Sequence, residues 1–320
     1  MRAYIMWRLL TLPALLCGIS IISFTLLNLA PGDPAEILLR LQQPGTEPPR
    51  EAVLALRHRL HLDDPLPVQY GRWLLLAMRG DFGVSYRSGK PIVKELWQRL
   101  PATLLLAGAS LALAASIGIP LGIMAAVWRG SLLDGLSRLL ALLGAVVPSY
   151  VLALLLVLLF AVKLGWLPAI GYGSPKHLIL PTVALAGGVS AQLMRVTRAS
   201  LLDVLTQDYV RTARAKGMHE SVVIVGHALK NALLPVVTVL GISLGHLLGG
   251  AVIVETIFGW PGIGKHAVDA IFLRDYPVIQ GFVLYMAMVF VLVNLAVDLT
   301  YRRLDPRLHF GQQSPEESNG

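Results

Sequence analysis

The segment that comes closest to a known chemical motif lies at residues 259–266, where the sequence is GWPGIGKH. It nearly matches the phosphate-binding loop GxxxxGK[ST], in which backbone N–H groups hold phosphates and the last hydroxyl binds Mg²⁺. Here His266 replaces the hydroxyl residue, and Pro261 has no backbone N–H to donate. No buried strand precedes the segment. We therefore expect a rigid glycine and proline turn, and no nucleotide site on this chain.

Three histidines are candidates for binding a metal ion or a transported solute. His58 and His61 lie three residues apart on an expected amphipathic helix over 51–62, which could bring both to one ion. Because no third ligand lies nearby in sequence, a solvated helix face is favoured and the role of the pair stays open. His246 lies well inside an expected membrane span, so it is a candidate for the substrate path. A hydrogen bond to a neighbouring helix is the alternative. No catalytic residue, cofactor site or firm metal site is assigned.

The composition is that of a membrane protein. Of 320 residues, 55% are hydrophobic and 14% are charged, and the mean hydropathy is +0.65. The apolar residues come in long runs, which excludes a soluble domain of this size. The net charge of +8 requires no nucleic acid partner, since Lys and Arg gather at the cytoplasmic ends of membrane spans. The lone Cys17 excludes a disulfide framework.

The runs that must position these candidates are long enough to cross a bilayer, which takes about 20 residues of helix. We predict an all-α polytopic membrane protein with six spans, at 9–29, 102–127, 139–162, 178–194, 233–254 and 278–300. The corresponding organisation is an N-terminal transmembrane helix at 1–30, a long extracytoplasmic loop region at 31–100, a transmembrane core at 101–305 and a cytoplasmic tail at 306–320.

Lys and Arg predict the orientation. The termini and the loops on their side carry these residues in roughly three to one excess over the two short loops on the other side, which indicates that both termini are cytoplasmic. The loop at 31–100 is left out of the comparison because long loops cross largely regardless of charge. Within the spans, small residues such as Gly118 and Gly122 recur at four-residue spacing and predict close helix packing.

The polar interval at 203–235 is predicted to be cytoplasmic. Its sequence predicts two short helices, the first ending at Gly217 and the second capped by Ser221. Ala213 and Gly217 are four apart, so they would share a face and leave a shallow notch. Basic residues flank this notch, namely Arg211, Arg214 and Lys216. We expect a cytoplasmic motor protein to dock there.

Several segments together resemble the permeases of ABC importers of the dipeptide, oligopeptide and nickel branch. YVRTARAKG at 209–217, followed by HALKNALLP at 227–235, is similar to their cytoplasmic coupling segment. Arg211 and Thr212 stand where the general pattern has Glu and Ala, so no role of that Glu is carried over. Further segments resembling the B-type subunit are APGDP, DFG, LPAT, ETIFGWPGIG and RDYPV. The segments at 166–173 and 270–277, with His177, look most like the nickel importer's B subunit.

The resemblance implies a type I ABC-importer transmembrane domain in the bacterial inner membrane. This chain and a companion C-type permease would form the pathway, and an extracytoplasmic solute-binding protein would deliver the substrate. Two cytoplasmic ATPases would bind the ATP and Mg²⁺, so the chain itself would not be an enzyme. The expected ATPase-coupling residues are Arg211, Ala213, Arg214, Ala215, Lys216 and Gly217.

The substrate suggested by the finer resemblance is nickel, free or chelated. A dipeptide or oligopeptide is the alternative. An ion-coupled secondary transporter working alone is a different class, and it is disfavoured because the spans hold no chain of carboxylates near the midplane. A purely structural membrane scaffold is the remaining possibility.

Overall fold

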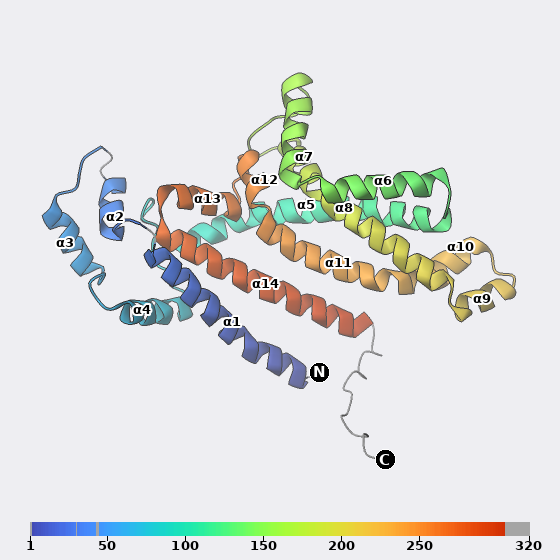
Figure 1. The fold of residues 1–320 in the computed structure, drawn as a ribbon, viewed down its shortest axis with the longest axis horizontal. Coiled ribbons are helices and arrows are strands. Elements are labelled where there is room, and N and C mark those ends of the chain that lie inside the picture. Colours follow the sequence, from blue (N-terminus) through green and yellow to red (C-terminus); the bar gives the residue numbers. More distant parts are fainter. Residues whose placement is uncertain (1, 30, 43–44, 305–320) are drawn as a thin grey trace, which may run out of the picture. The chain divides into compact units, whose positions relative to one another are not determined.

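The structure is a computed structural model that describes residues 2–29, 31–42 and 45–304. Within these ranges the regular structure is helical, apart from a single bridge between Val84 and Pro91 (Figure 1). The prediction of an all-α protein is confirmed. The predicted tail at 306–320 lies outside the described residues.

The chain divides into two compact units, each built from segments that are distant in sequence. The first unit comprises residues up to 109, residues 150–184 and residues 246–291. The second comprises residues 110–149, residues 185–245 and residues from 292 onward. Long helices such as α5 (Ile92–Val127) and α8 (Pro175–Leu205) contribute one part to each unit.

The first unit contains the N-terminal helix and most of the short helices. The region predicted as a loop at 31–100 is largely helical. Besides parts of α5 and α8, the unit holds α1 (Arg2–Leu29), α2 (Pro34–Gln42), α3 (Arg50–Arg59), α4 (Leu66–Met78), nearly all of α7 (Ser149–Leu156), the π-helix η1 (Val157–Lys163), α12 (Val252–Ile257), α13 (Ile263–Leu273) and most of α14 (Tyr276–Leu304).

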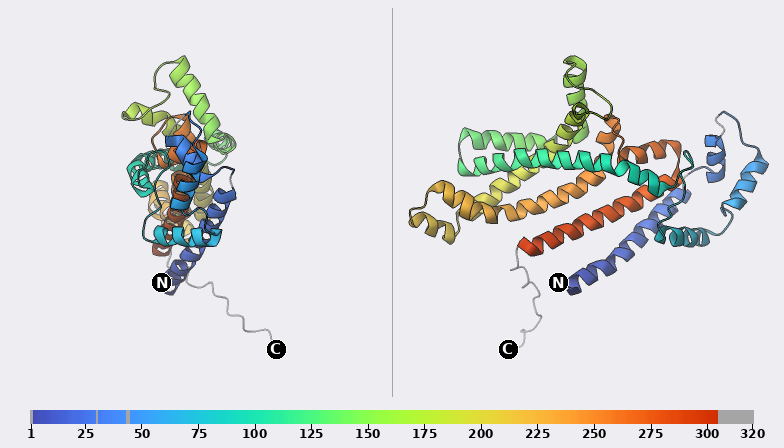
Figure 2. Two further views of the ribbon diagram at one scale, coloured as in Figure 1. Left: turned by 90° about the vertical axis from the view of Figure 1, so that its left-hand side faces the viewer. Right: turned by 180° about the vertical axis from the view of Figure 1, so that it is seen from behind.

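The second unit is built around the C-terminal part of α5, beside which α6 runs (Figure 1 and Figure 2). Its helices are α6 (Leu132–Val146), α9 (Asp208–Ala215), α10 (Glu220–Val222), the π-helix η2 (Val223–Ala228), most of α11 (Leu229–Gly250), whose last residues from His246 belong to the first unit, and the remaining parts of α5, α8 and α14.

Four helices in the described ranges are long and apolar enough to cross a membrane, and the number is six if each of two broken pairs counts as one span. The prediction of six spans agrees with the larger number. The run at 139–162, predicted as one span, is broken: α6 ends at Val146 and α7 begins at Ser149. Pro148 lies in the gap, and the residue before a proline is disfavoured in helical geometry.

Helix α5 packs on α8 in the second unit at two glycines. A Cβ atom on Gly118 would lie 2.5 Å from the carbonyl oxygen of Ser190, and one on Gly122 would lie 2.7 Å from the carbonyl oxygen of Met194. Since neither backbone atom can move away cheaply, only glycine fits. The predicted close approach at these positions is confirmed. Gly108, on the same helix, has nothing within 4 Å of an added Cβ.

A buried ion pair also fixes α8, in this case to α6. Asp134 is 1% exposed, and Arg198 donates to it twice, from Nε to Oδ1 at 2.7 Å and from Nη2 to Oδ2 at 3.0 Å. The backbone N–H of Gly130 donates to Oδ2 at 3.0 Å. A bidentate pair of this kind fixes orientation as well as distance.

Buried carboxylates perform the same task in the first unit. Asp275 is 2% exposed and accepts from the Ser85 hydroxyl at 2.6 Å and from the backbone N–H groups of Tyr86 and Arg87 at 3.0 and 3.2 Å. These contacts attach the turn before α5 to the start of α14. Apolar contacts among Ile92, Leu96 and Val278 lie close to them.

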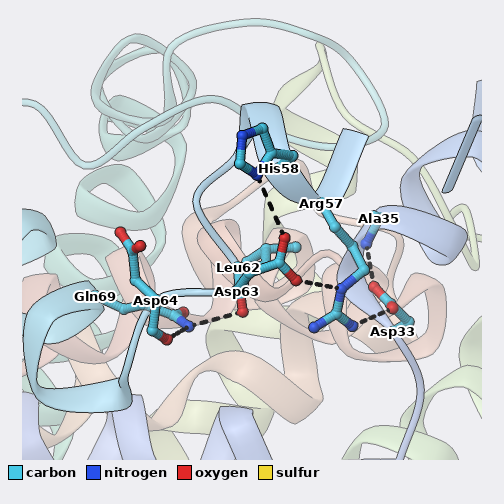
Figure 3. Close-up of polar contacts among 8 residues, drawn as sticks. All are labelled: Asp33, Ala35, Arg57, His58, Leu62, Asp63, Asp64 and Gln69. Atoms are coloured by element: carbon cyan, nitrogen blue, oxygen red, sulfur yellow. Dashed lines mark hydrogen bonds and ion pairs between the residues drawn. The ribbon is translucent and has the colours of Figure 1, made fainter. Parts of the chain in front are cut away.

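The short helices α2 and α3 are joined by a polar contact at Arg57 (Figure 3). Its Nη1 lies 2.6 Å from Asp33 Oδ2, and its Nε donates to Asp63 Oδ1 at 2.9 Å. Asp33 also accepts from the Ala35 N–H at 2.9 Å, which starts α2. One guanidinium therefore links the beginning of α2 to the turn that follows α3.

Replacing Gly122 by Ala is expected to destabilise the protein by about 1–3 kcal/mol, because the added methyl group overlaps the backbone of α8. The matched control is Gly108→Ala, which adds the same group to the same helix in open space and is expected to be neutral or stabilising by up to about 1 kcal/mol. Thermal unfolding of the purified variants in lipid nanodiscs measures both. Equal stability of the two variants would contradict the close packing of α5 on α8.

Candidate functional site: the segment between α8 and α11

The predicted docking segment at 203–235 begins where α8 ends, at Leu205. The Thr206 hydroxyl donates to the carbonyl oxygen of Asp203 at 2.7 Å and closes the end of the helix. Gln207 is extended, with ψ of 149°, so the chain changes direction there before α9 starts at Asp208. The turn therefore makes α9 a separate short helix and not a continuation of α8.

The inner face of α9 is apolar. Val210 is 0% exposed and Ala213 is 7% exposed. They pack in a cluster with residues from the adjoining helices, which we call the α9 cluster: Ala126, Leu201, Val210, Ala213, Val223, Ala228 and Ala232. Because its members come from α5, α8, α9, η2 and α11, the cluster holds α9 against the ends of three long helices.

The outer face of α9 is basic, with exposed side chains at Arg211, Arg214 and Lys216. Arg214 bridges to the next helix, because its Nη2 lies 2.6 Å from Glu220 Oε1 and its Nε lies 3.1 Å from Oε2. The hydrogen bond that Arg214 donates to Glu220 raises the pKa of Arg214 above its usual value. Arg214 is therefore paired within the segment, whereas Lys216 is exposed.

Two details of the predicted docking notch are wrong. Ala213 faces the buried cluster, so it cannot form an exposed notch. Gly217 does not share a face of α9 with it, because the helix ends at Ala215 and Lys216 is its C-cap. The prediction applied helical spacing to residues beyond Ala215, where α9 has already ended.

The predicted glycine stop at Gly217 is confirmed. Its φ is +74°, and its N–H donates to the carbonyl oxygen of Arg214 at 2.9 Å. The predicted cap of the second helix is wrong: His219 is the N-cap, and its Nδ1 accepts from the Ser221 N–H at 3.4 Å. A histidine ring nitrogen supplies the acceptor that was expected from serine.

The histidines predicted as ligand candidates do not come together. His246 lies on α11 with an exposed side chain. His58 is on α3, but His61 lies beyond its end with φ of 55°, so the predicted helix over 51–62 is too long. The two rings instead face different carboxylates, at 3.8 Å from Asp63 and 3.8 Å from Asp64. No group of three potential metal ligands occurs in the described part of the chain.

The phosphate-loop-like segment at 259–266 surrounds a side chain of this same chain. The Lys265 N–H donates to Oε2 of Glu255 at 2.9 Å, and the Thr103 hydroxyl donates to Oε1 at 2.8 Å. A Cβ on Gly262 would overlap the Glu255 carboxylate. Burial raises the pKa of Glu255, and the hydrogen bonds from Lys265 and Thr103 oppose that rise. The glycines therefore hold an internal carboxylate.

Sequence reasoning did not identify Glu255 as a key residue, although it lies within a family-like segment. The same network includes Thr103, which accepts from the Ile263 N–H at 2.9 Å, and Trp260, whose indole donates to the Ala102 carbonyl at 2.9 Å. The family-like segments at 100–103 and 255–264 are thus joined by one buried network of hydrogen bonds. The sequence feature that could have pointed to Glu255 is its position as a single acidic residue directly after the predicted span at 233–254.

Comparison with known families gives the class of the protein. The profile described as "Binding-protein-dependent transport system inner membrane component" matches residues 118–310, and its N-terminal counterpart matches residues 1–107. The chain belongs to this family of membrane permeases.

Curated relatives narrow the class. The chain is 43% identical to the dipeptide transport system permease protein DppB of Alkalihalophilus pseudofirmus and 42% identical to the glutathione transport system permease protein GsiC of Salmonella paratyphi A. Each alignment covers 97% of this chain and 100% of the relative. It is an ABC-importer permease of the dipeptide and glutathione type, and the expected assignment to a nickel-specific subunit is not supported.

Solved structures support the fold. The inward-facing methionine ABC transporter MetNI matches with a TM-score of 0.55 and 20% identity, over 66% of this chain and 96% of that chain. At this identity the likeness concerns the fold alone, which is that of a type I ABC-importer transmembrane domain.

The backbone at Gly217 yields a direct test of the segment. An added Cβ meets nothing within 4 Å, so substitution strains the left-handed backbone without a clash. Gly217→Val is expected to destabilise the segment by about 1–2 kcal/mol, whereas Gly217→Asn should be tolerated because Asn adopts this conformation more readily. Hydrogen exchange of residues 208–222 measures the difference. Wild-type exchange in the Val variant would contradict the described turn.

Proposed function

We propose that this chain imports small peptides, of the dipeptide or glutathione class, as one of two permeases in an ATP-driven complex. The observation that supports this is the 42–43% identity to dipeptide and glutathione permeases over 97% of the chain. Substrate would pass inward across the bacterial inner membrane, with both termini of this chain in the cytoplasm. The Lys and Arg distribution supports that orientation.

The proposed complex contains a companion C-type permease, two cytoplasmic ATPases and an extracytoplasmic binding protein. ATP and Mg²⁺ are bound by the ATPases, and this chain contributes the pathway. We assign the ATPase contact to the outer face of the segment between α8 and α11. The exposed Lys216 can pair with an acidic group there, as can Arg211, whose Nη1 otherwise lies 3.5 Å from the exposed Asp208. The half-exposed Tyr209 and Val222 add apolar contact area.

The α9 cluster explains how a movement of this segment would be transmitted to the membrane helices. Val210 and Ala213 are buried against residues of α5, α8 and α11, so displacing α9 alone would open an apolar cavity. Close-packed interfaces of this kind move as units and do not deform gradually. The ATPases would therefore switch the helix ends together with α9.

Gly217→Trp in the complete complex is expected to abolish ATP-driven uptake, because a large side chain projects from the proposed ATPase contact. Gly130→Trp is the matched control. Gly130 also has a positive φ, +80°, and open space around an added Cβ, but it lies in the turn between α5 and α6. Both variants carry the same backbone strain, so uptake should be lost only at Gly217. Normal uptake by Gly217→Trp, or equal loss in both, would contradict the assignment.

The substrate class is tested by uptake in cells that lack their own peptide and nickel importers. Cells expressing this permease with its partner subunits are expected to accumulate a labelled dipeptide or labelled glutathione. Uptake must require ATP and the binding protein, which also tests against an ion-coupled carrier. Accumulation of ⁶³Ni²⁺ without any peptide uptake would overturn the proposal in favour of nickel.

A further inference from the structure

Helix α4 has a surface that water solvates poorly. It has 13 residues, none of them buried, and Arg72 is its one charged residue. Large apolar side chains project from it, with exposed fractions of 51% at Leu66, 49% at Val68, 57% at Leu75, 41% at Leu76 and 68% at Met78. So many exposed large apolar side chains on one short helix indicate a partner or a lipid phase.

The side of α4 that is in contact with protein packs on α1 (Figure 1 and Figure 2). The hydroxyl groups of Tyr70 and Ser20 are 2.8 Å apart, and Tyr70 also lies 3.7 Å from the Cys17 sulfur. The ring of Phe24 lies 5.4 Å from that of Tyr70, edge to face, and 6.2 Å from that of Trp73. Helix α4 is thus attached to the body of α1 and not to its tip.

The position of these contacts along α1 sets their depth in the bilayer. Taking Leu29, where α1 ends, as the edge of the hydrocarbon core and α1 as parallel to the membrane normal, a rise of 1.5 Å per residue puts Phe24 about 7.5 Å and Ser20 about 13.5 Å below that edge. The hydrocarbon core is about 30 Å thick, so Ser20 lies near its middle and Phe24 well inside one leaflet. The side chains of α4 that reach them must enter the same leaflet.

We propose that α4 lies within the bilayer, in the leaflet that surrounds the C-terminal half of α1, with its exposed apolar side chains against lipid acyl chains. The lipid-facing surface of α1 continues it, because Ile21, Ile22 and Leu26 are 47%, 61% and 62% exposed. The region at 31–100 therefore contains a membrane-embedded helix. The inference holds for either orientation of the chain and for any substrate.

The polar groups of α4 are arranged to suit this position. Arg72 is paired with Asp64 at 3.0 Å, so its charge extends toward the aqueous end of the helix. Gln69 donates to the carbonyl oxygens of Leu62 and Asp64 at 3.0 and 2.8 Å, which holds the start of α4 at the polar turn (Figure 3). The hydroxyl of Tyr70 is paired with that of Ser20, so this polar group is not left without a partner beside α1.

Helix α3 provides the contrast. Leu54 is 60% exposed, close to the 57% of Leu75, but α3 carries several charged residues, Arg50, Glu51, Arg57 and Arg59. Helix α3 is held instead at the start of α2, through Arg57 and Asp33. Two leucines with equal exposure in the isolated chain are therefore expected to differ in environment.

The test places a single cysteine at Leu75 or Leu54 in the full complex, with Cys17→Ser as background, and attaches a nitroxide spin label. In proteoliposomes, collisions at Leu75→Cys should be more frequent with oxygen, which dissolves in lipid, than with a water-soluble nickel chelate. At Leu54→Cys the order should reverse. A charged maleimide should also react at least about tenfold more slowly at Leu75→Cys than at Leu54→Cys, because hydrocarbon excludes charge.

Each outcome of the spin-label experiment decides the question. High collision rates with the nickel chelate at Leu75→Cys would place α4 in water and overturn the proposal. Low rates with both reagents would show that another protein subunit covers α4, which also overturns it. High oxygen and low chelate rates at Leu75→Cys, with the reverse at Leu54→Cys, would support it. Uptake assays on the same variants test the transport function separately, so failure of one does not decide the other.

Discussion

The burial of two small side chains, Val210 and Ala213, is the contact on which the proposed mechanism depends. They join α9 to residues of α5, α8 and α11 through the α9 cluster. A short helix of eight residues has little stability of its own. Its position is therefore set by this tertiary packing, so any force on α9 is passed to the ends of the long helices.

Further contacts within each unit hold its helices rigidly in place. In the second unit, glycines let α5 approach α8 closely, and the Asp134–Arg198 pair fixes α8 to α6. In the first unit, Glu255 accepts hydrogen bonds from Thr103 on α5 and from the Lys265 N–H at the start of α13. Asp275 accepts one from Ser85 in the turn before α5. Buried carboxylates are costly unless their partners are complete, so they hold these segments in one arrangement. Rigid helix packing at both places is what a switch between discrete states requires.

The sequence predicted the helical fold, the glycine stop at Gly217 and the close packing at Gly118 and Gly122, because each has a strong local signal. It failed where contacts between distant segments decide the outcome. Ala213 could not be assigned to a buried face until the turn at Gln207 had placed α9, and Glu255 could not be paired with Thr103 across 152 residues. The nickel assignment rested on short segments shared with peptide permeases.

The proposed coupling requires that the segment between α8 and α11 lies in the cytoplasm and is bound by the ATPases. The most direct measurement is labelling of Lys216→Cys, in a Cys17→Ser background, with a membrane-impermeant maleimide. We expect no labelling in intact cells, rapid labelling in inside-out vesicles stripped of the ATPases, and protection when the ATPases are added back. Labelling from the outside of intact cells would contradict it.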